Sequence, residues 1–320
     1  MSAETRSNLK AAIDIGSNSI KLRVGRWEKG QASILLDTTE VVKLSRGFRG
    51  ETTPRILDET MENAVRVVTE MASRAREMGA DVRLVGTMAL RQAVNAGEFL
   101  SRIRGTTGLE VQILSGEEEA LYSWEGALST LQGEPSGDLV MFDTGGGSTE
   151  FVFGRKNRIS KIQSVPTGAV SLTERFLGSG PVRQADLDAA MEHVSYLLQE
   201  NGIERQHPTV PPFVVGLGGG VIAMVSVKSG KEPFIPVDLN GQSLTQKDIM
   251  RQMRLYASLT LEERQNVIGL PPSRADVILG SACIVLCILK VLNVPSCLAS
   301  INGLRHGVLM EMFTEAERPQ

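Results

Sequence analysis

The chain has 320 residues, which is more than one typical domain needs and favours two. Its hydrophobic content of 42% and charged content of 22% are typical of a globular protein, and residues 1–16 contain no apolar leader. The net charge of −3 argues against a broad nucleic-acid-binding surface, although a local basic groove stays open. The most apolar stretch, residues 277–289, is too short to span a bilayer and predicts a buried helix. We therefore expect a soluble protein that binds neither nucleic acid nor a membrane.

The three cysteines give no sign of a disulfide framework. Cys283 and Cys287 lie four residues apart in the apolar stretch, where buried thiols are common, and Cys297 has no partner at CxxC spacing. An odd number of unpaired thiols favours a reducing compartment, so we predict a cytoplasmic location.

Short apolar runs alternate with amphipathic segments, which is typical of the α/β class. The pattern predicts strands at 11–15, 20–27 and 33–43, followed by a helix at 54–79 with Pro54 at its start. A strand at 81–87, a helix in two pieces at 89–105, a strand at 109–114 and a helix beginning near 115 follow.

Residues 139–155 repeat the organisation of the first two strands. An offset of 129 residues places Asp14 on Asp143, and the two stretches are then identical at five of thirteen positions. The shared residues are Asp14/Asp143, Gly16/Gly145, Ser19/Ser148, Gly25/Gly154 and Arg26/Arg155. The pattern predicts an internal duplication of a strand–turn–strand unit.

Both copies carry small residues in the turn and an aspartate at the end of the first strand. Small residues expose backbone N–H groups that bind phosphate oxygens, and the aspartate can hold a divalent cation beside them. A plain hairpin turn would need one glycine at most, so the duplicated pattern favours a phosphate clamp.

These residues belong to a set of motifs that resembles the exopolyphosphatase/guanosine pentaphosphate phosphatase family, part of the acetate kinase/actin/Hsp70 superfamily. The motifs are AIDIGSNSIKL (12–22), GTMALRQAVNAGEF (86–99), ILSGEEEA (113–120), FDTGGGSTEFVFG (142–154), GLGGG (216–220) and RADVILGSA (274–282). The resemblance implies an α/β fold of two ribonuclease-H-like (actin-like ATPase) domains with an interdomain cleft. The expected domains are 1–125, onto which a helix at 303–320 packs back, and 126–302.

Two segments depart from the family pattern. The later glycine loop reads GLGGG where the family usually has a sequence close to GTGGT, and SINGLRHG has Ile301 and His306 where acids are frequent. These departures bear on substrate choice more than on the chemistry.

The resemblance and the residues together predict the roles of the acidic side chains. Asp14 and Asp143, each at a strand end, suit a shared Mg²⁺ site. In SGEEEA, Ser115 and Glu118 form a capping box, and Glu119 corresponds to the family's water-activating general base. Glu150 resembles the second catalytic carboxylate, although it and Thr149 also fit exposed strand positions.

The substrate-binding residues are expected at the two turns and one arginine. Arg91 can grip phosphate bidentately, whereas Lys21 is better interpreted as a solvated strand residue. The histidines form no metal or triad pattern. The predicted phosphate cradle consists of Gly16, Ser17, Asn18, Ser19, Gly145, Gly146, Gly147 and Ser148.

The leading hypothesis is an exopolyphosphatase that removes the terminal phosphate of inorganic polyphosphate with Mg²⁺. The alternatives are guanosine pentaphosphate hydrolysis by the same site and a nucleotide-bound actin-like switch. The sequence is also compatible with a homodimer. An aromatic content of only 4% disfavours a guanine-stacking platform. Polyphosphate is therefore the expected substrate, with Arg46, Arg49, Arg102 and Arg104 as nearby cations.

Overall fold

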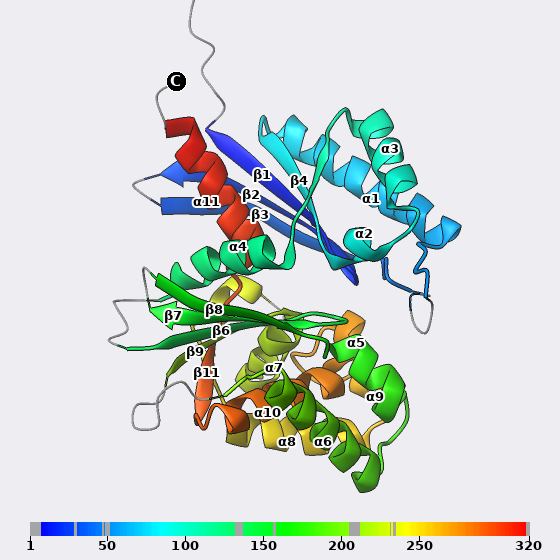
Figure 1. Cartoon of the computed structure of the whole chain (residues 1–320), viewed down its shortest axis with the longest axis vertical. Helices are drawn as coiled ribbons and strands as arrows, with labels where there is room; N and C mark the ends of the chain where they lie inside the picture. Colours follow the sequence, from blue (N-terminus) through cyan, green and yellow to red (C-terminus); the bar gives the residue numbers. More distant parts are fainter. Residues whose placement is uncertain are drawn as a thin grey trace, which may run out of the picture. The chain divides into compact units, whose positions relative to one another are not determined.

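The computed structural model (Figure 1) describes residues 8–28, 31–46, 48, 52–131, 137–155, 158–204, 212–230, 232 and 235–317. Contacts within the chain divide it into two units, Met1–Gly126 with Leu304–Gln320, and Ala127–Gly303. The chain leaves the first unit within α4 (Gly116–Leu128) and returns to it where α11 (Leu304–Glu317) begins. In the described part of the chain, no helix has both the length and the apolar character that crossing a bilayer requires.

The first unit contains a five-stranded sheet in the order β3-β2-β1-β4-β5. Its strands are β1 (Leu9–Ile15), β2 (Ser19–Glu28), β3 (Gln31–Val41), β4 (Asp81–Gly86) and β5 (Val111–Ile113). The first three are antiparallel neighbours, whereas β4 pairs in parallel with β1 and with β5. The remaining helices are α1 (Asp58–Glu77), α2 (Met88–Gln92) and α3 (Ala96–Thr107).

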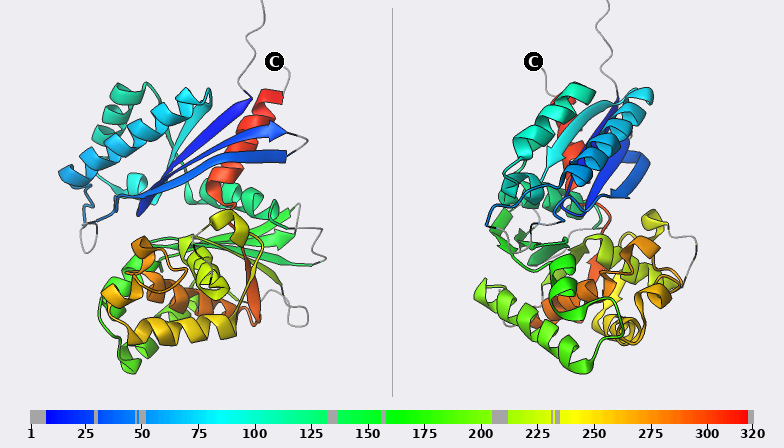
Figure 2. Two further views of the ribbon diagram at one scale, coloured as in Figure 1. Left: turned by 180° about the vertical axis from the view of Figure 1, so that it is seen from behind. Right: turned by 90° about the vertical axis from the view of Figure 1, so that its right-hand side faces the viewer.

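Alternating residues of β1 enter two different cores. Ile13 and Ile15 pack with residues of α1 and α3, whereas Ala12 packs with residues of α11. Figure 2 shows α1 and α11 on opposite faces of this sheet. Because side chains alternate along a strand, Asp14 shares the face of Ala12, which α11 covers.

The second unit contains a six-stranded sheet in the order β10-β11-β9-β6-β7-β8. Its strands are β6 (Leu139–Thr144), β7 (Thr149–Arg155), β8 (Arg158–Val165), β9 (Phe213–Leu217), β10 (Ser243–Thr245) and β11 (Ser296–Ala299). Its helices are α5 (Ala169–Leu172), α6 (Gln184–Glu200), α7 (Gly219–Ser229), α8 (Gln246–Ser258), α9 (Leu261–Arg264) and α10 (Ile278–Val291). Short turns of π-helix at Thr173–Leu177 and of 3₁₀-helix at Pro236–Leu239 and Pro272–Arg274 complete it.

The apolar stretch forms the buried helix α10, as predicted. Cys283, Cys287 and Cys297 are all free and buried, and burial raises the pKa of the Cys283 thiol. These thiols belong to the hydrophobic core of the second unit.

The backbone confirms the internal duplication. Asp14 pairs across the strands with Lys21, and Asp143 pairs with Glu150, which is the same position 129 residues later. The N–H of Gly16 donates to the Ser19 carbonyl at 3.1 Å, and that of Gly145 donates to the Ser148 carbonyl at 2.9 Å. The second strand of each copy even carries a register shift at the matching place, Val24/Gly25 and Phe153/Gly154.

Two predicted boundaries are wrong for identifiable reasons. Helix α1 begins at Asp58, not near Pro54, because Leu57 is extended and the Pro54 carbonyl accepts a hydrogen bond from Val94. Strand β3 ends at Val41 because the next two N–H groups, of residues 42 and 43, donate to the Asn18 carbonyl instead of continuing the ladder. Tertiary hydrogen bonds therefore set both limits.

Candidate functional site

The first small-residue turn, residues 16–19, has its carbonyl oxygens occupied by the segment that follows β3. The Asn18 carbonyl accepts from Val42 at 3.0 Å and from Lys43 at 2.9 Å, and the Ser17 carbonyl accepts from Ser45 at 3.1 Å. The carbonyl oxygens of residues 17 and 18 therefore fix the turn to the segment that follows β3.

The second turn, residues 145–148, is held in the same way by the segment that follows β8. Ala169 donates to the Gly145 carbonyl at 2.9 Å, and residues 170 and 171 donate to the Gly146 carbonyl at 2.9 and 3.1 Å. A Cβ on Gly168 would lie 2.3 Å from the Gly146 carbonyl oxygen, so only glycine admits this approach. The glycines thus serve packing within the chain as well as any ligand.

The backbone N–H groups inside the two turns differ from the carbonyl groups in their hydrogen bonding. Among the described residues, no hydrogen bond uses the backbone N–H groups of Ser17, Asn18, Gly146 or Gly147. Successive backbone N–H groups of this kind form anion-binding concavities. Each unit therefore offers backbone N–H groups that can donate hydrogen bonds to a phosphate.

Asp14, at the end of β1, is 5% exposed and pairs with a lysine. The Lys21 Nζ lies 3.6 Å from Asp14 Oδ2 and the side chain is 33% exposed, so Lys21 pairs with the aspartate as well as contacting solvent. The other carboxylate oxygen of Asp14, Oδ1, is buried and has no hydrogen-bond partner among the described residues. Such an oxygen is costly to bury unless a ligand satisfies it.

Asp143 and Glu150 are cross-strand neighbours at the start of the second unit's hairpin. Ser148 Oγ donates to Glu150 Oε1 at 2.6 Å, and Ser164 Oγ donates to the same oxygen at 3.1 Å. Thr149, for which an exposed strand position was the alternative interpretation, is fully buried, and its hydroxyl donates to the Thr167 carbonyl at 2.6 Å.

Arg91 and Glu119 form an ion pair within the first unit. Arg91 lies near the end of α2 and also donates to the Leu114 carbonyl, which precedes α4. Glu119 lies in the first turn of α4, where the helix dipole favours a carboxylate. The predicted phosphate-binding arginine and the predicted base are thus brought together.

The capping box at the start of α4 is confirmed. The Ser115 N–H donates to Glu118 Oε2 at 2.7 Å, and the Glu118 N–H donates to Ser115 Oγ at 3.1 Å. These hydrogen bonds hold the pKa of Glu118 below its usual value. Glu118 is therefore committed to the helix end, which leaves Glu119 as the distinct neighbouring acid.

The residues fit a divalent cation only in part. In the described ranges, no group of three or more His, Cys, Asp or Glu side chains gathers in a way that could hold a metal ion. The partnerless buried oxygen of Asp14 suits a cation ligand, and so does the carboxylate pair Asp143 and Glu150. Asp14 and Asp143 belong to different units, so a metal shared between them stays a prediction.

The unusual GLGGG segment lies against Arg274, the first residue of the RADVILGSA motif, to which the sequence analysis assigned no role. Gly216 and Leu217 end β9, and Gly218 has a φ of 103°, with an added Cβ 3.3 Å from Asp143 Oδ1. A Cβ on Gly219 would lie 2.5 Å from Arg274 Nη2, so the glycine admits this guanidinium to the N-terminus of α7.

The SINGLRHG segment places its two unusual residues in cores. Ile301 packs against the core of the second unit, and its N–H donates to Asn240 Oδ1 at 3.0 Å. His306 is 5% exposed, and burial together with the Arg23 charge lowers its pKa to about 4. Neither side chain contacts a predicted site residue in the interactions described.

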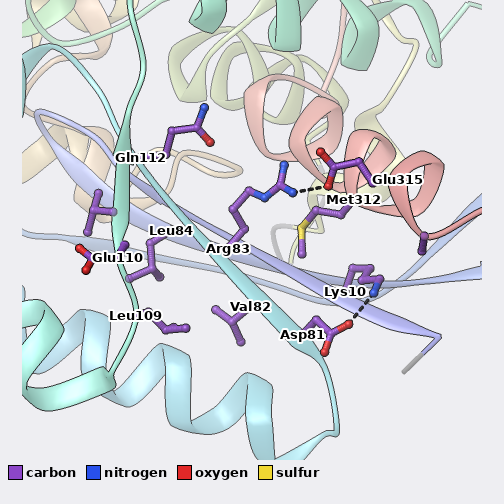
Figure 3. A pocket seen from close by; sticks show the side chains of 12 residues that line it. Lys10, Asp81, Val82, Arg83, Leu84, Leu109, Glu110, Gln112, Met312 and Glu315 are labelled. Atoms are coloured by element: carbon purple, nitrogen blue, oxygen red, sulfur yellow. Dashed lines mark hydrogen bonds and ion pairs between the residues drawn. The ribbon is translucent and has the colours of Figure 1, made fainter. Parts of the chain in front are cut away.

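The additional arginines do not support an extended basic groove in the first unit. Arg102 pairs with Glu98 at 2.6 Å and Arg104 with Glu110 at 2.8 Å, while Arg46 is exposed and Arg49 lies outside the described residues. A hollow of about 680 Å³ beside β4 and α11 (Figure 3) contains none of the predicted site residues, and the charges of Lys10 and Arg83 are paired there.

A known protein family matches most of the chain. The Ppx/GppA phosphatase family model matches residues 24–316. The guanosine-5'-triphosphate,3'-diphosphate pyrophosphatase of Photobacterium profundum is 29% identical over 310 residues. That alignment covers 97% of this chain, which spans 60% of the length of the curated relative.

Solved structures match over nearly the whole chain. A crystal structure of the Aquifex aeolicus member of the Ppx/GppA family has a TM-score of 0.82 at 29% identity, covering 97% of this chain and 99% of that one. An exopolyphosphatase-like protein has a TM-score of 0.87 at 26% identity, covering 98% of this chain and 100% of that one. The predicted α/β fold with two sheets, the resemblance and the phosphatase class are thus confirmed.

Proposed function

Because this chain belongs to the Ppx/GppA phosphatase family, we propose that it hydrolyses the terminal phosphoanhydride bond of inorganic polyphosphate. The observation that carries the proposal is the Arg91–Glu119 ion pair at the start of α4, which joins a phosphate-binding cation to a carboxylate. Together with Glu150, this pair favours hydrolysis over an actin-like binding switch.

The chain's own residues supply two parts of such a reaction. The amide groups of the two turns bind nonbridging phosphate oxygens, and Arg91 adds a fixed positive charge. Donors aimed at the oxygens of the transferring phosphoryl group stabilise the charge that develops there.

Glu119 acts as the general base. Its carboxylate is held by Arg91, and a bound phosphate would compete for the same guanidinium. The exchange of Glu119 for phosphate on Arg91 would release the carboxylate to take a proton from the attacking water. The base is then freed only when substrate is present.

A magnesium ion would be held by Asp14 in the first unit and by Asp143, with Glu150 beside it, in the second. When bound, the ion neutralises charge on the phosphate chain. Lys21 partly balances the charge of Asp14.

Guanosine pentaphosphate is the second candidate substrate, because the curated relative from Photobacterium profundum is named for that nucleotide. Arg274 at the N-terminus of α7 offers a further cation for a phosphate of such a ligand. Against it stands the low aromatic content of 4%, which offers little for stacking a guanine.

The test is phosphate release from long-chain polyphosphate, guanosine pentaphosphate and ATP, compared as kcat/KM at one ionic strength. We expect polyphosphate to be preferred and its binding to weaken steeply with salt, since several charges pair along a linear polyanion. A clear preference for the nucleotide would transfer the assignment to the second candidate. No phosphate release from any of the three would refute hydrolysis of these substrates.

A further inference from the structure

We propose that Ser164 is a positioning residue for Glu150, holding the carboxylate in the orientation that hydrolysis needs. This inference rests on the proposed function, because it assumes that Glu150 takes part in the reaction. No sequence motif marks Ser164, which lies on β8, fourteen residues after the acid it contacts.

Two hydroxyl groups hold the same oxygen of Glu150 from two different elements. Ser148 Oγ, in the glycine turn, donates to Oε1 at 2.6 Å, and Ser164 Oγ, on the neighbouring strand, donates to it at 3.1 Å. Ser164 is the residue directly opposite Glu150 in the β7–β8 register. A glutamate side chain has several rotatable bonds, and donors from two directions restrict it to one rotamer.

The position of Asp143 explains why such a restraint is needed. Glu150 lies between Asp143 on β6 and Ser164 on β8 in one row across the sheet. Like charges directly opposite each other repel, which disfavours an orientation of the Glu150 carboxylate toward Asp143. The Ser164 hydroxyl stands on the other side, where it accommodates the carboxylate with a hydrogen bond.

In the matching cross-strand row of the first unit, a positive charge lies opposite the aspartate. There the residues are Asp14, Lys21 and Thr39, and the Lys21 ammonium pairs with Asp14. In the second unit the residue that matches Lys21 is itself an acid, Glu150, opposite an aspartate. The contrast assigns the restraining role in the second unit to the serine hydroxyls.

The first experiment measures Ser164→Ala, Ser164→Thr and Ser160→Ala side by side. Ser160 is a matched control, because its hydroxyl also lies on β8 but donates to the Phe153 carbonyl at 3.1 Å. We expect Ser164→Ala to lower kcat about tenfold with little change in KM, as is typical when a hydrogen-bond partner of a functional group is lost. Ser164→Thr, which restores the hydroxyl, and Ser160→Ala should both stay within about twofold of the parent chain.

The separate effects on kcat and on stability distinguish positioning from a structural role. A positioning role should lower the kcat of Ser164→Ala at an unchanged melting temperature, and Ser164→Thr should restore that kcat. A merely structural role would lower the melting temperature of Ser164→Ala and leave the kcat of the folded enzyme in place.

The double variant Ser164→Ala with Glu150→Gln tests whether the serine acts through the acid. We expect it to be no slower than Glu150→Gln alone, because residues acting as one unit are not additive. If Glu150→Gln is inactive while Ser164→Ala matches the parent chain, the inference about Ser164 is overturned and the proposed function stands. If Glu150→Gln itself turns over normally, Glu150 takes no part in hydrolysis, and the inference about Ser164 is overturned with that assignment.

Discussion

Arg91 and Glu119 illustrate how a residue pair can serve two states of the same site. Each is expected to act on a phosphate or on water, and the two side chains bind each other. In the proposed function, this pairing keeps a cation and a carboxylate in place at the end of α2 and the start of α4, and a substrate replaces one of them.

Replacement of Glu119 by Gln should separate the two roles. We expect kcat to fall by on the order of 10²–10⁴ because the general base is lost. The KM for polyphosphate should fall or stay level, since Arg91 is no longer held by a carboxylate. Steady-state kinetics measure both quantities.

Glu118→Gln is the matched control on the same helix turn. It should cost at most about 1 kcal/mol of stability through the weakened capping box and leave turnover unchanged. If Glu118→Gln is the inactive variant and Glu119→Gln is active, the two roles must be exchanged.

The lowered pKa of His306 predicts how the stability of the protein depends on pH. Burial and the Arg23 charge lower its pKa to about 4 in the folded chain, with Asp37 opposing them, whereas the unfolded pKa is near 6.5. Between these two values the unfolded chain binds the proton more readily, so stability falls as the pH drops through that window. The slope contributed by this side chain is at most about 1.4 kcal/mol per pH unit.

The comparison to make is urea unfolding of the parent chain and His306→Gln at pH 7.5, 5.5 and 4.5. The variant should lose less stability on acidification than the parent. Equal losses at every pH would show that other groups cause the acid sensitivity.

At the scale of elements, close packing between α4 and α11 holds α4 in place. A Cβ on Gly307 of α11 would lie 2.1 Å from the Tyr122 carbonyl oxygen of α4, so the two helices touch through their backbones. Beside this contact, the Tyr122 hydroxyl donates to Glu311 at 2.7 Å, and Arg83 of β4 pairs with the same carboxylate. The helix that carries Glu119 is thereby fixed to α11 and to the sheet.

Gly307→Ala should therefore destabilise the protein by roughly 1–3 kcal/mol, because the added methyl group forces the helices apart. Gly105→Ala in α3 is the control, since a Cβ there meets nothing within 4 Å. Alanine at that exposed helical position should stabilise by up to about 1 kcal/mol. Thermal unfolding of both variants decides, and equal melting temperatures would contradict the packing argument.

Each of the two units contains one copy of the duplicated hairpin, with an aspartate at the end of its first strand and a small-residue turn. The copies differ in the residue opposite the aspartate: Lys21 in one matches Glu150 in the other. One copy therefore has a charge-balanced aspartate and the other a pair of carboxylates.

Asp14→Asn and Asp143→Asn test whether both copies contribute to one metal site. If both aspartates hold Mg²⁺, each change should raise the Mg²⁺ concentration needed for half-maximal rate, because a charged ligand is lost. Activity that survives exhaustive chelation would remove the metal from the mechanism, and an effect of only one variant would place the site in one unit.

The sequence by itself determined the features that depend on local pattern. Helix α10 and the capping box at Ser115 could be predicted from hydrophobic periodicity and short-range spacing. The duplication could be found because each hairpin is continuous in the chain. The family motifs identified the phosphatase class for the same reason.

Only the tertiary structure decided features that depend on register and on distant contacts. Lys21 pairs with Asp14 and Ser164 reaches Glu150 because strand register brings them opposite each other, and the Thr149 hydroxyl donates to the Thr167 carbonyl, eighteen residues away in the chain. A one-residue slip of register would turn each side chain to the other face, and no local pattern specifies that choice. Cross-strand partners therefore had to be observed, since the chain encodes them through the whole sheet and not through any one of its strands.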